Sequence, residues 1–268
     1  MVIINTNPLI GNPPSEISLK DPPLICVIAQ VRFSQPIRSI EERTFIDPFY
    51  QTIQEDYPTL KIENSFYLEF KEQKVIRTES KVWRFEEELN KNWRVSLTSY
   101  FVALETIGYS GQEEFFERLL KILKAVDSQI KPQSIARFGL RYIDRLTGED
   151  TKNITNLVRP EMAGILSTEF GEYIHQTINE SLFKLPEKNA EILARWGLLP
   201  ANTTIDPSII EPIDEPSWIL DLDISSSLER PFDVDSTMKE AKSFAERIYT
   251  FFRWVVTDNF LSRFGGEL

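Results

Sequence analysis

The spacing of apolar and polar residues along the chain predicts alternating strands and helices. Residues 23–33, PLICVIAQVRF, form a largely apolar run, as expected of a strand in the centre of a sheet. Three later segments alternate polar and apolar residues, which is typical of antiparallel strands: 61–70, 81–87 and 92–109, the last two joined by a turn at 90–92. Helices are expected from Asp47-Pro48 to Glu55 and over 111–130.

The second half begins with SIARFGLRYIDRL at 134–146, whose apolar residues recur at intervals of two. This spacing predicts a strand, and it places Arg137, Arg141 and Arg145 together on one face. The remaining predicted elements are a short helix at 155–166 with an internal proline, strands at 172–185, 190–200 and 217–228, and a long helix at 235–264 capped by Asp233 or Asp235.

The same order of elements occurs twice, which suggests an internal duplication. VRF at 31–33 resembles LRY at 140–142, and FFERLLKIL from Phe115 resembles FAERIYTFF from Phe244. We therefore expect an α+β fold in which two similar βαβββα halves, 23–132 and 133–268, follow an N-terminal arm of residues 1–22. The halves would form one structural unit, with a continuous antiparallel sheet and long helices on one face.

Composition excludes several classes of function. The 268-residue chain has a net charge of −11, which argues against binding nucleic-acid phosphates over a broad surface. Cys26 is the only cysteine, so no disulfide can form within the chain, as is usual in a reducing cytoplasm. No signal peptide is recognisable, and no stretch approaches the roughly 20 apolar residues that span a bilayer. We expect a soluble cytoplasmic protein without membrane association.

The arginine face of the strand at 134–146 admits two interpretations. It could form a cradle for a phosphate or carboxylate, because each guanidinium group presents a planar fork of donors. The candidate set is Arg137, Arg141 and Arg145 together with Arg32, which the repeat pairs with Arg141. Alternatively the arginines form ion pairs across strands with Asp221 and Asp223, an ordinary way to fill the polar face of a sheet. The two arrangements can coexist on one face.

The paired acidic residues raise a third interpretation. Asp221 and Asp223, with Asp144, could hold Mg²⁺ for phosphoryl chemistry. Triphosphate-tunnel enzymes carry a Glu-x-Glu-x-Lys signature near their first strand, and this chain has none there. Glu86 and Glu88 have the right spacing but lack the lysine. A metal-dependent phosphohydrolase is therefore the less favoured alternative.

Other catalytic signatures are weak. His175 is the only histidine, and neither a G-x-S-x-G elbow nor a glycine-rich phosphate loop is present. A zinc site would need further histidines or cysteines, and Cys26 lies in an apolar run typical of a buried thiol. Trp83 and Trp93 each precede an arginine and could stack on bases, but the acidic charge favours core positions. We expect no catalytic residue, metal or cofactor.

The terminal helix is unusually aromatic. Its apolar residues at helical spacing predict a buried face: Phe244, Ile248, Phe251, Phe252, Val255 and Val256. Tyr249, Trp254 and Phe260 fall partly off that face. Excess aromatic area of this kind is typical of a surface that binds a protein partner. The Pro-rich acidic segment at 200–216 is a long loop, and such loops are usually functional or mobile.

Several motifs resemble those of a sporadically distributed family of uncharacterised prokaryotic proteins. They are NPLIGNPPSEIS, PPLICVIAQVRF, VWRFEE, the segment from WRVSLTSYFVALETIGY to FFERLLKIL, ARFGLRYIDRL, and DLDISS before the long helix. The resemblance covers most of the chain and is most specific from Tyr109 to the strand at 140–145. Members often have Asn where Asp144 stands, so a shared role for this side chain does not follow. The resemblance brings no established activity with it.

Together these features predict a non-enzymatic binding or regulatory module that engages a protein partner. The sporadic distribution of the resembled family, like that of mobile loci, implies a phage-defence or toxin–antitoxin context. The alternative is a protein that binds a small anion or nucleotide on the arginine face.

Overall fold

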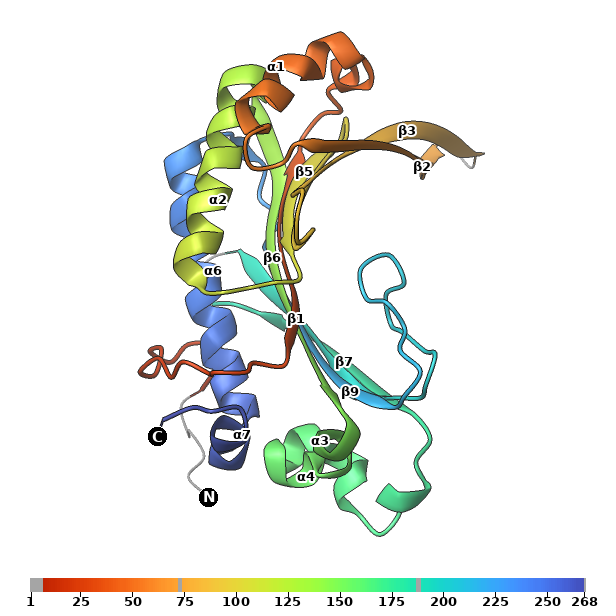
Figure 1. Cartoon of the computed structure of the whole chain (residues 1–268), viewed down its shortest axis with the longest axis vertical. Coiled ribbons are helices and arrows are strands. Elements are labelled where there is room, and N and C mark those ends of the chain that lie inside the picture. The colour runs from red at the N-terminus through yellow and green to blue at the C-terminus, as the bar shows by residue number, and fades with distance from the viewer. Residues whose placement is uncertain (1–6, 72–73, 187–188, 268) are drawn as a thin grey trace. The chain divides into compact units, whose positions relative to one another are not determined.

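The computed structural model describes residues 7–71, 74–186 and 189–267, without the side chains of 65–79. The chain divides into two compact units (Figure 1). Unit 2 comprises Cys26–Leu140 and Ser225–Lys242, and unit 1 comprises Met1–Ile25, Arg141–Ile224 and Ser243–Leu268. Residues 1–6 of the predicted arm lie outside the described residues.

Unit 2 contains an antiparallel sheet in the order β2-β3-β4-β5-β1, and β6 lies next to β1. Its strands are β1 (Leu24–Phe33), β2 (Thr59–Lys71), β3 (Lys74–Glu86), β4 (Trp93–Leu97), β5 (Phe101–Thr106) and the first part of β6 (Ser134–Thr147). Its helices are η1 (Arg38–Glu41), α1 (Arg43–Ile53) and α2 (Gln112–Ala125), which continues into η2 (Val126–Ile130). The long hairpin of β2 and β3 is visible in Figure 1.

The predicted strand at 92–109 is in fact a hairpin. β4 ends at Leu97 and β5 begins at Phe101, and the two pair in antiparallel register. The hydroxyl group of Thr98 accepts hydrogen bonds from the backbone N–H groups of Tyr100, at 3.0 Å, and Phe101, at 3.1 Å. This side chain closes the turn locally, so an alternating pattern that reads as one strand folds back on itself.

The first helix begins earlier than its proline predicts. α1 starts at Arg43, with Glu42 as its N-cap residue, and Pro48 lies inside it. Asp47 does not cap the helix, because its Oδ1 accepts a hydrogen bond from Arg43 Nε at 2.6 Å. This pair joins residues four apart on the same helical face.

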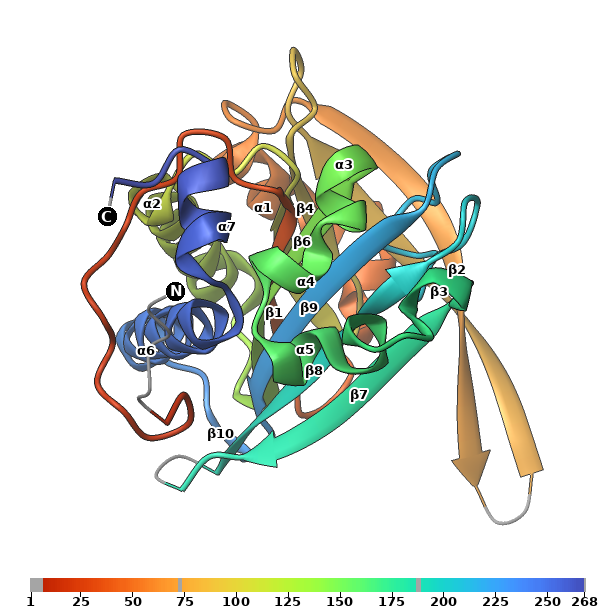
Figure 2. The same ribbon diagram turned by 90° about the horizontal axis from the view of Figure 1, so that it is seen from below.

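Unit 1 contains an antiparallel arrangement in the order β6-β9-β8-β7, with β7 at its edge (Figure 2). Its strands are the second part of β6, β7 (Thr177–Lys184), β8 (Ala190–Leu199) and most of β9 (Ser217–Ser226). The short β10 (Arg230–Pro231) belongs to unit 2, where it pairs with the first part of β6. Its helical elements are α3 (Gly148–Lys152), α4 (Ile154–Leu157), α5 (Pro160–Ala163), η3 (Gly164–Ser167), η4 (Gly171–Tyr173), the later turns of α6 (Val234–Val255) and α7 (Asp258–Arg263). Residues 7–22 contain no helix or strand.

Two predicted elements of the second half have different bounds in the structure. The helix expected at 155–166 is divided into the single turns α4 and α5 and the 3-10 turn η3, and Pro160 occupies the first position of α5, where its missing N–H costs nothing. The strand expected from 172 begins only at Thr177, so His175 lies in an exposed loop before it.

The terminal helix is interrupted after Val255. Thr257 caps α7, accepting a hydrogen bond from the N–H of Phe260 at 3.3 Å, and its hydroxyl group also donates to the carbonyl of Asn156 at 2.8 Å. This second bond ties the break to α4, a contact distant in sequence. At the other end, Asp233 Oδ1 accepts from the N–H of Ser236 at 2.7 Å, which confirms Asp233 as the capping residue.

The described residues thus form an α+β protein with an antiparallel sheet, as the alternating patterns predict. Cys26 is a buried free thiol on β1. Trp83 and Trp93, considered as stacking platforms, are both buried. No helix in the described part of the chain is long and apolar enough to cross a membrane.

Candidate functional site

The centre of the predicted arginine face is a buried ion pair in unit 1. Arg141 on β6 donates from Nε to Oδ1 of Asp221 on β9, at 2.7 Å, and from Nη2 to Oδ2, at 2.8 Å. Its Nη1 donates to Asp206 Oδ2 at 2.8 Å. Arg141 is 8% exposed and Asp221 is fully buried. Burial lowers the pKa of Arg141, but hydrogen bonds and charges of Asp221 and Asp206 outweigh it and raise the pKa overall.

The neighbouring arginines, Arg145 and Arg195, make fewer hydrogen bonds and ion pairs than Arg141. Arg195 on β8 lies with Nε 3.2 Å from Asp221 Oδ2, close enough for an ion pair. Arg145 donates from Nη2 to the carbonyl of Glu211 at 2.8 Å, and burial lowers the pKa of Arg145. The Nε atom of Arg145 is buried without a hydrogen-bond acceptor among the described residues. The Nε atom of Arg195 makes no well-aligned hydrogen bond, but it is occupied by the ion pair with Asp221.

The acidic segment at 200–216 is held against this face. Besides the bonds to Asp206 and Glu211, Gly148 N donates to Glu215 Oε2 at 3.0 Å. Within the segment, Thr204 donates from its hydroxyl group to the carbonyl of Ile210 at 2.7 Å. For Asp206, burial raises the pKa, but hydrogen bonds from Ser208 and Arg141 lower it overall. The segment therefore supplies counter-charges to the arginines.

The other two predicted arginines belong to unit 2. Arg32 is exposed on β1. Arg137 lies along the backbone of its own strand, where a Cβ atom built on Gly139 would lie 2.5 Å from Nη1 of Arg137. The absent side chain of Gly139 thus makes room for the guanidinium group. Asp223 is half-buried on β9, two residues after Asp221.

Asp144 does not join Asp221 in a metal site. Alternation along β6 places its side chain on the face opposite Arg141 and Arg145. Asp144 is 7% exposed, and burial raises its pKa to about 7. Among the described residues, no group of three or more histidine, cysteine and acidic side chains could hold a metal ion.

A feature that the sequence interpretation missed lies before and along β7. Large apolar side chains are exposed throughout 165–182, and we call them the β7 edge surface: Ile165 (52% exposed), Phe170 (58%), Tyr173 (83%), Ile178 (38%) and Leu182 (59%). In the described part of unit 1, β7 pairs with β8 on one side only. The available sequence signal was the alternation Ile178, Glu180, Leu182, Lys184, in which apolar and charged residues share one face.

A glycine fixes where β7 begins. Gly197 on β8 has φ +152, and a Cβ atom there would lie 1.9 Å from the carbonyl oxygen of Thr177. Thr177 pairs with Leu198 and Ile178 with Gly197 in the register of the two strands. Only glycine lets the backbones approach this closely.

The aromatic residues predicted as a partner surface contact the chain itself. Phe260 is buried between Phe252, at a ring-centroid distance of 5.5 Å, and Phe264, at 4.6 Å. The guanidinium group of Arg159 lies 3.9 Å from the ring centroid of Trp254. Tyr249 hydrogen-bonds to the N-terminal arm. The aromatic excess of α6 and α7 is therefore used within unit 1.

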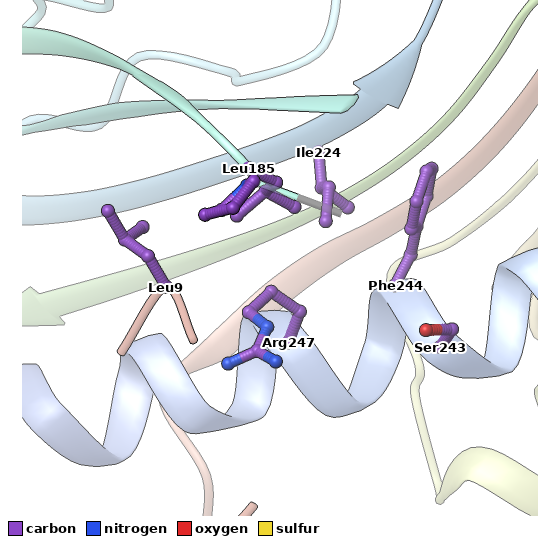
Figure 3. A pocket seen from close by; sticks show the side chains of 7 residues that line it. Leu9, Leu185, Ile224, Ser243, Phe244 and Arg247 are labelled. Carbon is purple, nitrogen blue, oxygen red and sulfur yellow. The ribbon is translucent and has the colours of Figure 1, made fainter. Parts of the chain in front are cut away.

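Unit 1 also has a small pocket beneath the N-terminal arm (Figure 3). Leu9 of the arm lies across it from Arg247 and Phe244 of α6. The other lining residues are Leu185, Pro186, Ile224 and Ser243. At about 40 Å³ the pocket has room for a water molecule but not for a nucleotide, and it includes no predicted site residue.

Comparison with models of known protein families finds no match for this chain, and comparison with curated proteins finds no relative.

Proposed function

We propose that the protein is a non-enzymatic binding module that engages a protein partner through the β7 edge surface. The observation that carries this proposal is the concentration of exposed large apolar side chains between residues 165 and 182. Scattered exposed apolar residues are normal on a protein surface, whereas a run of five along one short segment is typical of an interaction site.

The geometry of β7 supports binding by strand addition. An edge strand presents backbone N–H and C=O groups to which another chain can pair. Ile178 and Leu182 would give such a partner strand apolar contacts at alternate positions. Glu180 and Lys184 lie between and after them and would restrict the register of pairing through their charges. The expected partner segment is a strand with apolar residues four apart and a charged or polar residue between them on the same face.

Affinity purification of the tagged full-length protein from its native host tests the proposal. We expect one protein to copurify in constant ratio with the wild type and to be lost with Ile178→Lys/Leu182→Lys. Leu89→Lys is the matched control, because Leu89 is 89% exposed and lies outside the segment. Equal recovery with all three proteins, or no specific partner with any, would contradict the proposal.

A second candidate is a small-anion or nucleotide site on the arginine face. It is supported by the buried Nε donor of Arg145, which lacks an acceptor among the described residues. Inorganic phosphate should then raise the melting temperature of the wild type and have less effect on Arg145→Gln. If phosphate stabilises both proteins equally, this candidate fails. A phosphohydrolase activity that Asp221→Asn abolishes would favour the metal-dependent alternative instead.

We also propose that the two halves arose by duplication and form one continuous sheet with long helices on one face. The order of strands supports this, because each half pairs its first strand with its last long strand: β1 with β5, and β6 with β9. The family resemblance extends the proposal to a cytoplasmic role in phage defence or a toxin–antitoxin pair. Genes next to the one encoding this chain would test that context.

A further inference from the structure

The N-terminal arm, residues 7–22, lies along one surface of α6, and side chains of that helix hold its backbone. We call Arg247, Tyr249 and Arg253 the arm-binding surface. Nη1 of Arg247 donates to the carbonyls of Pro8, at 3.0 Å, and Gly11, at 2.9 Å. The first part of the arm is thus fixed through two carbonyl oxygens.

The middle of the arm is recognised in the same way. Tyr249 Oη accepts a hydrogen bond from the N–H of Ile17 at 2.8 Å and donates to the carbonyl of Ser15 at 3.3 Å. Nη1 of Arg253 donates to the same carbonyl at 3.2 Å and to Tyr249 Oη at 3.0 Å. All five bonds to the arm go to backbone atoms. A surface of this kind binds an extended peptide that cannot satisfy its own backbone groups.

The side chains of the arm are only partly buried. No residue from 7 to 22 is buried, and the half-buried Leu9 lines the pocket of Figure 3 without filling it. Proline recurs along the arm and at its junction with β1, where Pro22 and Pro23 restrict the backbone to extended conformations. The arm is therefore an extended segment, attached by hydrogen bonds and joined to the body by a stiff junction.

We propose that the arm-binding surface is an exchangeable peptide site that receives the arm of a second copy of this chain. A second copy has the same arm sequence and can make the same contacts. Exchange therefore keeps every hydrogen bond, and the only difference is that the arm and the surface that binds it belong to different chains. An arm tethered to its own surface has an effective concentration in the millimolar range. Exchanged dimers should therefore accumulate only as the protein concentration approaches that range. This interface differs from the β7 edge surface and does not depend on it.

Cysteine cross-linking between two full-length variants tests the exchange. Lys20 Nζ lies 3.6 Å from Glu267 Oε1. Because cysteine is shorter than either side chain, a short bismaleimide is used to join Lys20→Cys on one chain to Glu267→Cys on another, and the product reports an arm seated on the partner copy. The two proteins are mixed and treated with the bismaleimide, while the native Cys26 is buried. Raising the concentration from about 10 µM to about 1 mM should increase the cross-linked heterodimer at least about tenfold.

Two comparisons separate exchange from random collision. Lys20→Cys mixed with Glu113→Cys, an exposed residue on α2, should give only background. Adding Arg247→Ala and Arg253→Ala to the Glu267→Cys chain should lower the cross-linked heterodimer to that background, with folding checked by thermal unfolding. An excess of a synthetic peptide copying residues 7–20 should do the same without any substitution in the surface. A Lys20–Glu267 yield equal to the Glu113 control at every concentration would overturn the proposal.

Discussion

The alternation of polar and apolar residues predicts the surroundings of some charged side chains of β6 but not of all of them. The alternation along β6 correctly separates Arg141 and Arg145 from the apolar face. It also places Asp144 on that apolar face, where a carboxylate has no water to solvate it. The structure shows the consequence, because burial alone raises the pKa of Asp144.

The first prediction concerns stability against pH. The pKa of Asp144 is about 7 in the folded state and near 4 when unfolded, so the folded state binds the proton more tightly between these values. The contribution of Asp144 to stability must then fall as pH rises from about 4 to about 7, by up to about 4 kcal/mol. Asp144→Asn should therefore match the wild type in stability below about pH 4 and be more stable than the wild type above about pH 7.

Urea unfolding at several pH values measures this difference. Asp127→Asn, at an exposed position on η2, is the control and should leave the pH dependence of the wild type unchanged. A stability difference between the wild type and Asp144→Asn that does not change over this range would show that Asp144 is ionised in the folded protein.

The second prediction concerns the buried ion pair. Arg141→Met leaves Asp221 buried with only Arg195 nearby, and Asp221→Leu leaves Arg141 with only Asp206. Each single substitution should lower the free energy of unfolding by roughly 3–5 kcal/mol, and the double substitution by less than the sum. Chemical denaturation of the four proteins gives the coupling. Additive losses would mean that the pair does not interact as its geometry indicates.

At the scale of elements, periodicity predicted most strands because they have one buried and one polar face. It failed where a single side chain redirects the chain, as Thr98 does in the hairpin between β4 and β5. It also failed at Thr257, whose bond to the carbonyl of Asn156 fixes the break between α6 and α7. The β7 edge surface was missed because exposure of Ile178 and Leu182 depends on which strand lies at the edge.

The third prediction follows from the close approach of β8 to β7. Gly197→Ala places a Cβ atom against the carbonyl of Thr177, so the backbones must separate there. We expect a loss of roughly 1–3 kcal/mol in the free energy of unfolding and faster amide hydrogen exchange at 177–184. Gly111→Ala is the control, because no atom lies within 4 Å of its added Cβ. Unchanged exchange in β7 would mean that Gly197 is not needed for the pairing.

At the scale of the whole molecule, the net charge of −11 and the exposed apolar segment are the features on which our proposal of a protein partner is based. The sequence predicted the α+β class and the ion pair between β6 and β9, since both follow from alternation. It did not predict that the aromatic residues of α6 and α7 would contact the chain's own arm and loops. Some of those contacts join segments more than 200 residues apart, as in the pair of Ile17 and Tyr249.

The most direct test of the account is photo-crosslinking from β7 in the native host. A benzophenone amino acid at position 178 of the full-length protein should yield one protein adduct, identified by mass spectrometry. The same group at position 89 should yield none. No adduct from position 178, or the same adducts from both positions, would contradict the assignment of this edge as the binding surface.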